Sequence, residues 1–89
     1  MSNPKVILME KRIGAAIILV EDKRSVDTLN SILSKHAHII LGRQGIPVRD
    51  RGLNIISLVL EGSTDEISSL TGGIGRLEGI QVKSVLTRK

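Results

Sequence analysis

The feature that most constrains this chain is a repeated order of strand, helix and strand. Two apolar runs, at 12–20 and 53–60, are each followed by a segment in which apolar residues recur at helical spacing, and then by another strand-like run. Nearly every position in both runs is apolar, which is typical of strands covered on both faces. The sequence therefore predicts the order β-α-β-β-α-β.

The first helix is expected soon after Val20, where the polar residues Glu21, Asp22 and Lys23 end the strand run. Asp22 is a favourable N-cap residue, because its carboxylate can accept hydrogen bonds from free backbone amides. Beyond it, apolar side chains form one stripe that should pack on the sheet. The stripe consists of Val26, Leu29, Ile32 and Leu33.

A hairpin and a second helix follow. The stretch 38–46 contains glycines that favour a β-bulge or a close backbone approach, so an edge strand is predicted there, and the polar, arginine-bearing stretch 47–52 is its hairpin loop. Ser63 and Glu66 have the spacing of a capping box at the start of the second helix. Gly79 is expected to end that helix. The alternating run after it predicts a half-exposed last strand.

Right-handed connections place both helices on one face of a four-stranded antiparallel sheet, so the predicted fold is an α+β, ferredoxin-like βαββαβ sandwich. We expect one domain over 12–89, preceded by a flexible N-terminal leader at 1–11. The central strands stay apolar on the face that the helices leave open, and such faces usually mark interfaces. A homodimer or homotetramer is therefore expected, with Ile18, Ile56 and Leu58 as its interface residues.

The composition excludes several classes of function. The 89 residues contain no cysteine and no aromatic side chain, so disulfides and thiolate metal sites are absent. The apolar run 6–9 is too short for a secretory signal or a membrane span. A cytoplasmic protein with no membrane partner is expected.

The net charge of +4 suggests an anionic partner. The 13 basic residues are scattered, however, and the chain lacks the aromatic platforms on which single-stranded nucleic acids stack, so it is not expected to bind nucleic acid on its own. Arg43, Arg49 and Arg51 on the predicted hairpin could still hold a carboxylate or phosphate. This leaves a second interpretation open, a basic adaptor that binds nucleic acid or a partner protein through the hairpin.

No constellation of catalytic residues is visible, so no enzyme is predicted. His36 and His38 could share a face as metal ligands, but no cysteine or third histidine completes a site, and we predict neither a metal nor a cofactor. Glycines at 72–75 lie within the second helix pattern rather than before it. They therefore favour close packing against a neighbour over a phosphate-binding loop.

From Arg12 onward the chain resembles the family of iron-only hydrogenase system regulators, above all in VEDKRSVDTLNSILSKHAHIILGRQGIPVRDRGLNIISLVLEG and LTGGIGRLEGIQVKSVL. The resemblance implies an ACT-like domain of a class that forms oligomers and often binds small ligands where subunits meet. It also implies a role as a transcriptional regulator, and no catalytic motif comes with it. More distantly, the chain is similar to the C-terminal domain of the nickel-responsive repressor, of whose metal ligands only His38 has a counterpart.

The favoured interpretation is a non-enzymatic, ACT-like regulatory module that self-associates and senses a small-molecule effector. Its ligand is expected at a subunit interface, near the turn from the first strand into the first helix. There, Glu21, Asp22 and Lys23 present polar groups beside the amides that begin the helix. Arg43 on the second strand is the next candidate, since it could supply charge to a carboxylate-bearing ligand from a neighbouring subunit.

Overall fold

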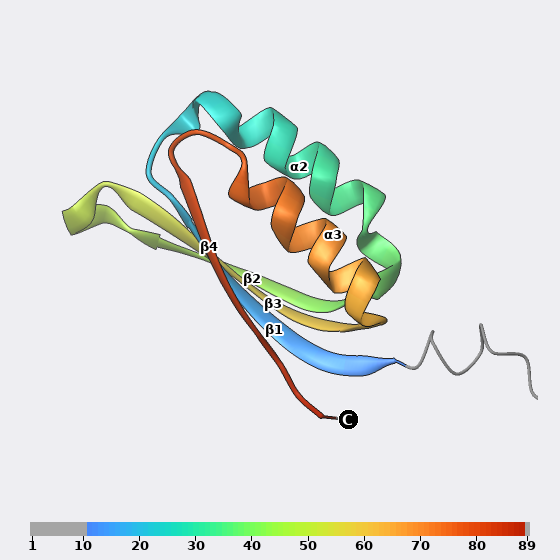
Figure 1. The fold of residues 1–89 in the computed structure, drawn as a ribbon. Coiled ribbons are helices and arrows are strands. Elements are labelled where there is room, and N and C mark those ends of the chain that lie inside the picture. The colour runs from blue at the N-terminus through green and yellow to red at the C-terminus, as the bar shows by residue number, and fades with distance from the viewer. Residues whose placement is uncertain (1–10, 89) are drawn as a thin grey trace, which may run out of the picture.

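The protein is a four-stranded antiparallel sheet with two helices packed on one face, in a computed structural model that describes residues 11–88 (Figure 1). The strand order is β2-β3-β1-β4. This arrangement confirms the predicted ferredoxin-like fold. The elements in chain order are β1 (Arg12–Val20), α2 (Val26–Lys35), β2 (Ile40–Val48), β3 (Leu53–Gly62), α3 (Thr64–Gly75) and β4 (Ile80–Leu86), with the short 3-10 turns η1 (Lys23–Ser25), η2 (Ala37–Ile39) and η3 (Arg49–Arg51).

The two most apolar strands, β1 and β3, lie at the centre of the sheet and pair along their whole length, from Arg12 opposite Gly62 to Val20 opposite Asn54. Alternate side chains of both strands point towards the helices and are buried. They form one core with the apolar stripes of α2 and α3. The core residues are Ala16, Ile18, Val20, Leu29, Leu33, Ile39, Leu58, Leu60, Ile67, Leu70, Ile74 and Ile80.

The predicted capping box begins α3. The backbone amide of Glu66 donates to Ser63 Oγ over 3.1 Å, and the amide of Ser63 donates to Glu66 Oε1 over 2.9 Å. Each side chain thus satisfies a backbone N–H that has no partner within the helix.

The end of α3 was predicted too late. The helix ends at Gly75, with Arg76 as its C-cap, whereas Gly79 lies in the following loop at a φ of 72°. The carbonyl oxygen of Gly79 accepts from the amides of Glu21, at 2.7 Å, and Asp22, at 3.2 Å. Gly79 therefore joins two loops at the same end of the sheet rather than ending a helix.

Asp22 also acts one element earlier than predicted. Its side chain accepts from the amide of Arg24 over 2.9 Å and so caps η1, while α2 begins behind Ser25 without a side-chain cap. The carboxylate is at the right place in the sequence, but a 3-10 turn lies between it and the helix.

The β2–β3 hairpin projects beyond the ends of both helices (Figure 1). As predicted, β2 is an edge strand and carries a bulge, seen as a shift of register between Ile40 and Gly42. It extends to Val48, two residues further than expected, and η3 then leads to Gly52 at a φ of 62°. The polar loop is accordingly shorter than the sequence suggested.

The start of β1 and the end of β4 lie side by side, because the amide of Thr87 donates to the carbonyl oxygen of Ile13 over 2.9 Å. The expected flexible leader at 1–11 falls outside the described residues, apart from Lys11. Within residues 11–88, the helices α2 and α3 have 10 and 12 residues and neither could cross a bilayer.

Candidate functional site

The face of the sheet opposite the helices carries exposed apolar side chains. Ile17 of β1 is 44 % exposed, Val59 of β3 49 % and Val85 of β4 63 %. Between them the small side chains of Ala15 and Ser57 leave a groove of about 300 Å³. We call this surface the open face. It is formed by the side chains of the sheet that point away from the helices.

The structure corrects the residues expected at an oligomer interface. Ile18 and Leu58 are 0 % and 1 % exposed, because they point towards the helices and lie in the core. Ile56 points the same way and packs against that core. A side chain enclosed within its own subunit cannot contact a second one, so an interface on the open face would use the alternate positions, such as Ile17 and Val59.

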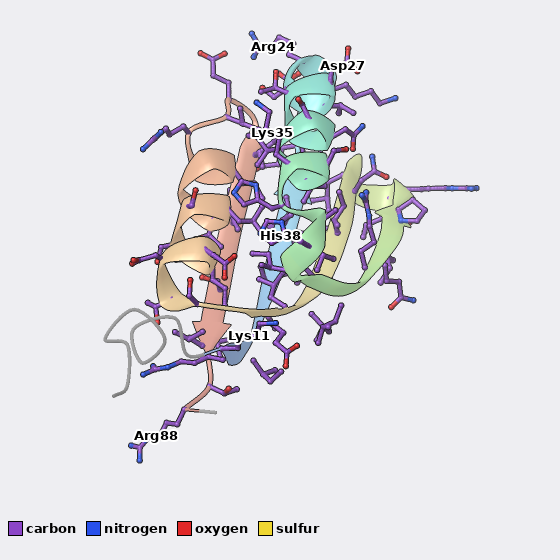
Figure 2. The ribbon with its side chains drawn as sticks, turned by 90° about the vertical axis from the view of Figure 1, so that its right-hand side faces the viewer. Lys11, Arg24, Asp27, Lys35, His38 and Arg88 are labelled. Atoms are coloured by element: carbon purple, nitrogen blue, oxygen red, sulfur yellow. The ribbon has the colours of Figure 1, made fainter. Side chains whose placement is uncertain are left out.

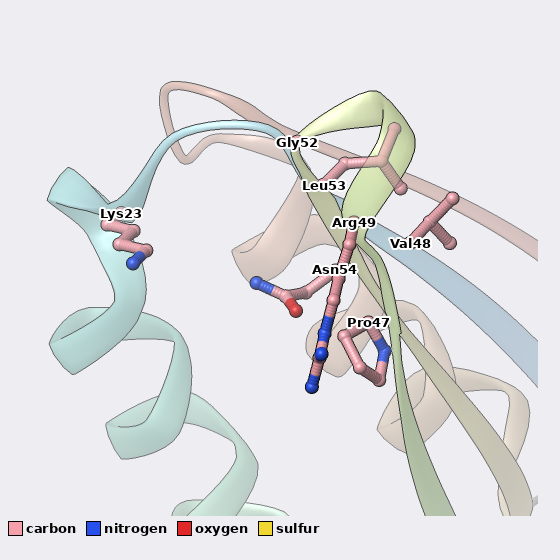
Figure 3. A pocket seen from close by; sticks show the side chains of 7 residues that line it. All are labelled: Lys23, Pro47, Val48, Arg49, Gly52, Leu53 and Asn54. Carbon is pink, nitrogen blue, oxygen red and sulfur yellow. The ribbon is translucent and has the colours of Figure 1, made fainter.

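A second cavity, of about 290 Å³, lies between η1 and the β2–β3 hairpin (Figure 3). We call it the hairpin pocket. In Figure 3 the side chains of Lys23, Arg49 and Asn54 reach into the space between these elements, with the ring of Pro47 beside the guanidinium of Arg49. The lining residues are Lys23, Pro47, Val48, Arg49, Gly52, Leu53 and Asn54.

The side chains of Glu21 and Asp22 are held by their own neighbours. Glu21 Oε1 accepts from Gln81 Nε2 over 2.5 Å. Asp22 Oδ2 accepts from Arg24 Nε over 2.7 Å and forms an ion pair with the same guanidinium. The side-chain hydrogen bond from Arg24, together with the backbone bond from the same residue, lowers the pKa of Asp22 below its usual value. Neither carboxylate lines the hairpin pocket.

Of the four residues expected to bind a ligand, only Lys23 lines the hairpin pocket. Arg43 pairs with Leu58 in the middle of β2, away from the turn, and contributes to a separate shallow depression of about 250 Å³. The structure therefore does not bring Arg43 together with Glu21, Asp22 and Lys23 within one subunit.

Asn54 and Pro47 are pocket residues that sequence reasoning did not select. They lie opposite each other in the register of β2 and β3. One signal was present, since Asn54 is an amide near the start of a mostly apolar strand. An exposed amide at such a position is a candidate for recognition of a ligand, because it adds nothing to the core.

The two histidines are engaged separately. His36 Nδ1 lies 2.8 Å from the carbonyl oxygen of Ile32, and His38 Nε2 lies 3.1 Å from Glu66 Oε2. Within residues 11–88 no group of three or more histidine, cysteine or acidic side chains is placed to hold a metal ion. The absence of a metal stays a prediction.

The carboxyl group of Glu66 contacts two neighbours, the backbone amide of Ser63 and the ring of His38. The backbone hydrogen bond from Ser63 is the main cause that lowers the pKa of this carboxyl, and the hydrogen bond from His38 acts in the same direction. Its charge is therefore maintained by the helix start that it caps.

The positive charge is spread over both ends of the molecule. Figure 2 shows Lys11 and Arg88 at one end and Arg24, beside Asp27, at the other. Arg24 is itself paired with an acid. A continuous basic surface of the kind that follows a nucleic-acid backbone is not formed by these residues.

Comparison with known proteins identifies the family. Residues 12–84 match the model of the TM1266-like family, described as "Iron-only hydrogenase system regulator, putative". The chain belongs to the TM1266-like family. The match covers every helix and strand described above except the last two residues of β4, and it confirms the resemblance seen in the sequence. The family's description is that of a regulator and names no reaction.

Two solved structures are similar to this TM1266-like chain. The uncharacterized protein TM1266 from Thermotoga maritima is 35 % identical and superposes with a TM-score of 0.84, covering 89 % of this chain and 100 % of its own. CPII from Thiomonas intermedia K12, a nitrogen regulatory PII-like protein bound to ADP, AMP and bicarbonate, is 11 % identical with a TM-score of 0.43, covering 91 % of this chain and 94 % of its own. No curated protein matches the chain.

Proposed function

We propose that this chain is a non-enzymatic regulatory module of an iron-only hydrogenase system, which self-associates through its open face and responds to a small ligand. Membership of the TM1266-like family supports the regulatory role. The observation that carries the proposal is the exposed apolar surface on the side of the sheet that neither helix covers. A monomer would leave this surface in water, whereas a second copy would remove it from water.

A second copy of the chain is the occupant that the open face fits best. The face carries opposite charges at separate places, Glu61 at one end of β3 and Lys83 on β4. Two copies related by a twofold axis can therefore bury their apolar centres while the acid of one approaches the lysine of the other. Self-association would also stabilise a small domain whose core contains no aromatic side chain.

The arrangement of polar groups supports regulation rather than catalysis. Asp22 is bound to Arg24 and Glu66 is bound within a helix cap, so these two acids, whose pKa values are lowered, serve local structure. Neither belongs to a cavity with a nucleophile and a base within hydrogen-bond reach. We therefore propose that the ligand regulates this protein by changing how strongly its copies associate.

Self-association is tested by measuring molar mass with light scattering and native mass spectrometry. Val59→Lys places a charge in the open face, so it should reduce the mass to that of the monomer while the circular dichroism spectrum stays unchanged. Thr28→Lys, which adds the same charge on the exposed side of α2, should keep the mass of the unmodified protein. A mass of 9.6 kDa for the unmodified chain at micromolar concentration would contradict the proposal.

A second candidate function is supported by the hairpin itself. Arg43, Arg49 and Arg51 are all exposed on the β2–β3 hairpin, which projects beyond the helices (Figure 1). We propose it as the contact of a basic adaptor for nucleic acid or for a partner protein of the hydrogenase system. A gel shift at several salt concentrations tests the nucleic-acid case, since each phosphate contact weakens binding as salt rises. No shift at low salt would eliminate that case.

A further inference from the structure

We propose that the hairpin pocket binds a small oxyanion carrying two negative charges, held by Lys23, Arg49 and Asn54. The inference rests on the proposed function, because it names the chemical class of the ligand to which the regulatory module responds. It differs from the ligand site expected from the sequence, which combined Lys23 with Glu21, Asp22 and Arg43. It rests on three side chains that two distant parts of the chain bring together (Figure 3).

The three side chains are free to donate to a ligand. Within residues 11–88 the side chains of Lys23, Arg49 and Asn54 form no hydrogen bond and no ion pair. Lysine supplies a compact ammonium, arginine a planar fork that can hold two oxygens at once, and asparagine an uncharged amide donor. Together they match an anion with several oxygens better than a cation or an apolar molecule.

The nearest acid of η1 does not compete for these donors. Asp22 is occupied by Arg24, whose terminal nitrogen lies 2.7 Å from Asp22 Oδ2 and whose other nitrogen lies 3.7 Å from Glu78 Oε2. Arg24 thus holds the carboxylate of Asp22 away from Lys23, and Lys23 itself forms no ion pair within residues 11–88. Asp50, on η3, does not line the pocket.

The size of the pocket suits a small ligand. A volume of about 290 Å³ is at the lower end of small-molecule sites and accommodates a diphosphate or a short dicarboxylate. Gly52 keeps the wall near η3 free of a side chain. Pro47 fixes the backbone of β2 opposite Asn54, so the amide is presented from a rigid position.

Binding is tested by isothermal titration calorimetry with two probes, inorganic pyrophosphate and succinate. We expect saturable binding of at least one probe, and the preferred probe distinguishes a phosphate ligand from a carboxylate ligand. Lys23→Ala and Arg49→Ala should each weaken binding by roughly tenfold or more, since each removes a charge-assisted hydrogen bond. Asn54→Asp should abolish it, because a carboxylate would then face the anion.

Arg51→Ala is the matched control, since Arg51 lies on the same turn η3 and loses the same charge but does not line the pocket. It should leave the affinity within about twofold, as expected where only long-range, screened attraction is lost. Binding of neither probe, or equal weakening by Arg51→Ala and Arg49→Ala, would overturn the inference. Circular dichroism of each variant confirms that it is folded.

The molar mass separates this inference from the proposed function. If a probe binds in the pocket while light scattering gives a monomer, the site stands and self-association fails. If the protein is an oligomer and neither probe binds, the pocket assignment fails while self-association stands. Repeating the mass measurement with saturating probe shows whether the anion alters the association.

Discussion

Ser63 and Glu66 illustrate how two side chains can determine where an element begins. Ser63 is 5 % exposed, and its hydroxyl and amide are both used within the capping box. The preceding residue, Gly62, is equally constrained, since a Cβ there would overlap a methyl group of Ile39. The passage from β3 to α3 thus depends on a hydrogen-bonding pair next to a residue without a side chain.

Replacing Ser63 with alanine should lower the free energy of unfolding by about 1 kcal/mol, because the amide of Glu66 loses its acceptor. Urea denaturation followed by circular dichroism measures the change. Ser68→Ala, on an exposed position of the same helix, should change it by less than about 0.5 kcal/mol. Equal effects of the two substitutions would show that the cap does not stabilise the helix.

Glu66 should make the stability depend on pH in the acid range. Its pKa is lowered in the folded protein, so its contribution is complete above the ordinary value of 4.5 and is lost as the pH falls through the lowered value. Glu66→Gln keeps an acceptor for the amide of Ser63 but does not titrate. We expect a smaller loss of melting temperature in this variant than in the unmodified protein on acidification below about pH 4.5, and an identical loss would contradict the assignment.

At the scale of elements, the loops are joined more tightly than their sequences suggest. Gly79 accepts two hydrogen bonds from the turn after β1, and its positive φ turns the chain into β4. A Cβ at Gly79 would also overlap the side chain of Asp22. The turn that carries Lys23 is therefore supported by the loop between α3 and β4.

Gly79→Ala should destabilise the protein clearly more than Gly52→Ala. Both glycines have a positive φ, so both substitutions cost roughly 1 kcal/mol of backbone strain. A Cβ at Gly52 meets only open space, whereas at Gly79 it must displace Asp22. Chemical denaturation of the two variants compares them, and equal losses would mean that the contact with Asp22 relaxes without cost.

The strands and the start of α3 could be predicted because their signals are local. Continuous apolar runs identify β1 and β3, and the Ser63–Glu66 spacing identifies a cap. The end of α3 could not, because Gly75 and Gly79 are both plausible termini and only the loop contact distinguishes them. Similarly, Ile18 and Ile17 are equally apolar, and the register of the whole sheet decides which of them is buried.

The site was only partly predictable for the same reason. Lys23 and Arg49 were recognisable as charged residues beside strand ends, but no local pattern joins them. The hairpin pocket exists because β3 pairs with both β1 and β2, which brings Pro47 and Asn54 next to the turn after Val20. A site formed by strand pairing between distant segments is visible only once the register is known.

At the scale of the whole molecule, stability and association should be linked. The open face exposes Ile17, Val59 and Val85 in the monomer, so a dimer buried there would add hydrophobic stabilisation to a small core. Only the folded chain forms this face. Association therefore shifts the equilibrium towards the folded state by mass action.

The melting temperature should consequently rise with protein concentration for the unmodified chain. Differential scanning calorimetry over a hundredfold range of concentration measures this, and the Val59→Lys variant should show no such dependence. A constant melting temperature for the unmodified chain, together with a constant mass, would mean that folding does not require a second copy.

The hydrogen bond between Thr87 and Ile13 has a consequence for how this fold can be combined with others. It places the entry and the exit of the domain at one corner of the sheet, where β1 begins and β4 ends. The hairpin pocket lies at the opposite end. The domain could thus be inserted into a surface loop of a larger host protein, because its two ends would join the host at neighbouring positions. Its pocket would then be directed away from the host.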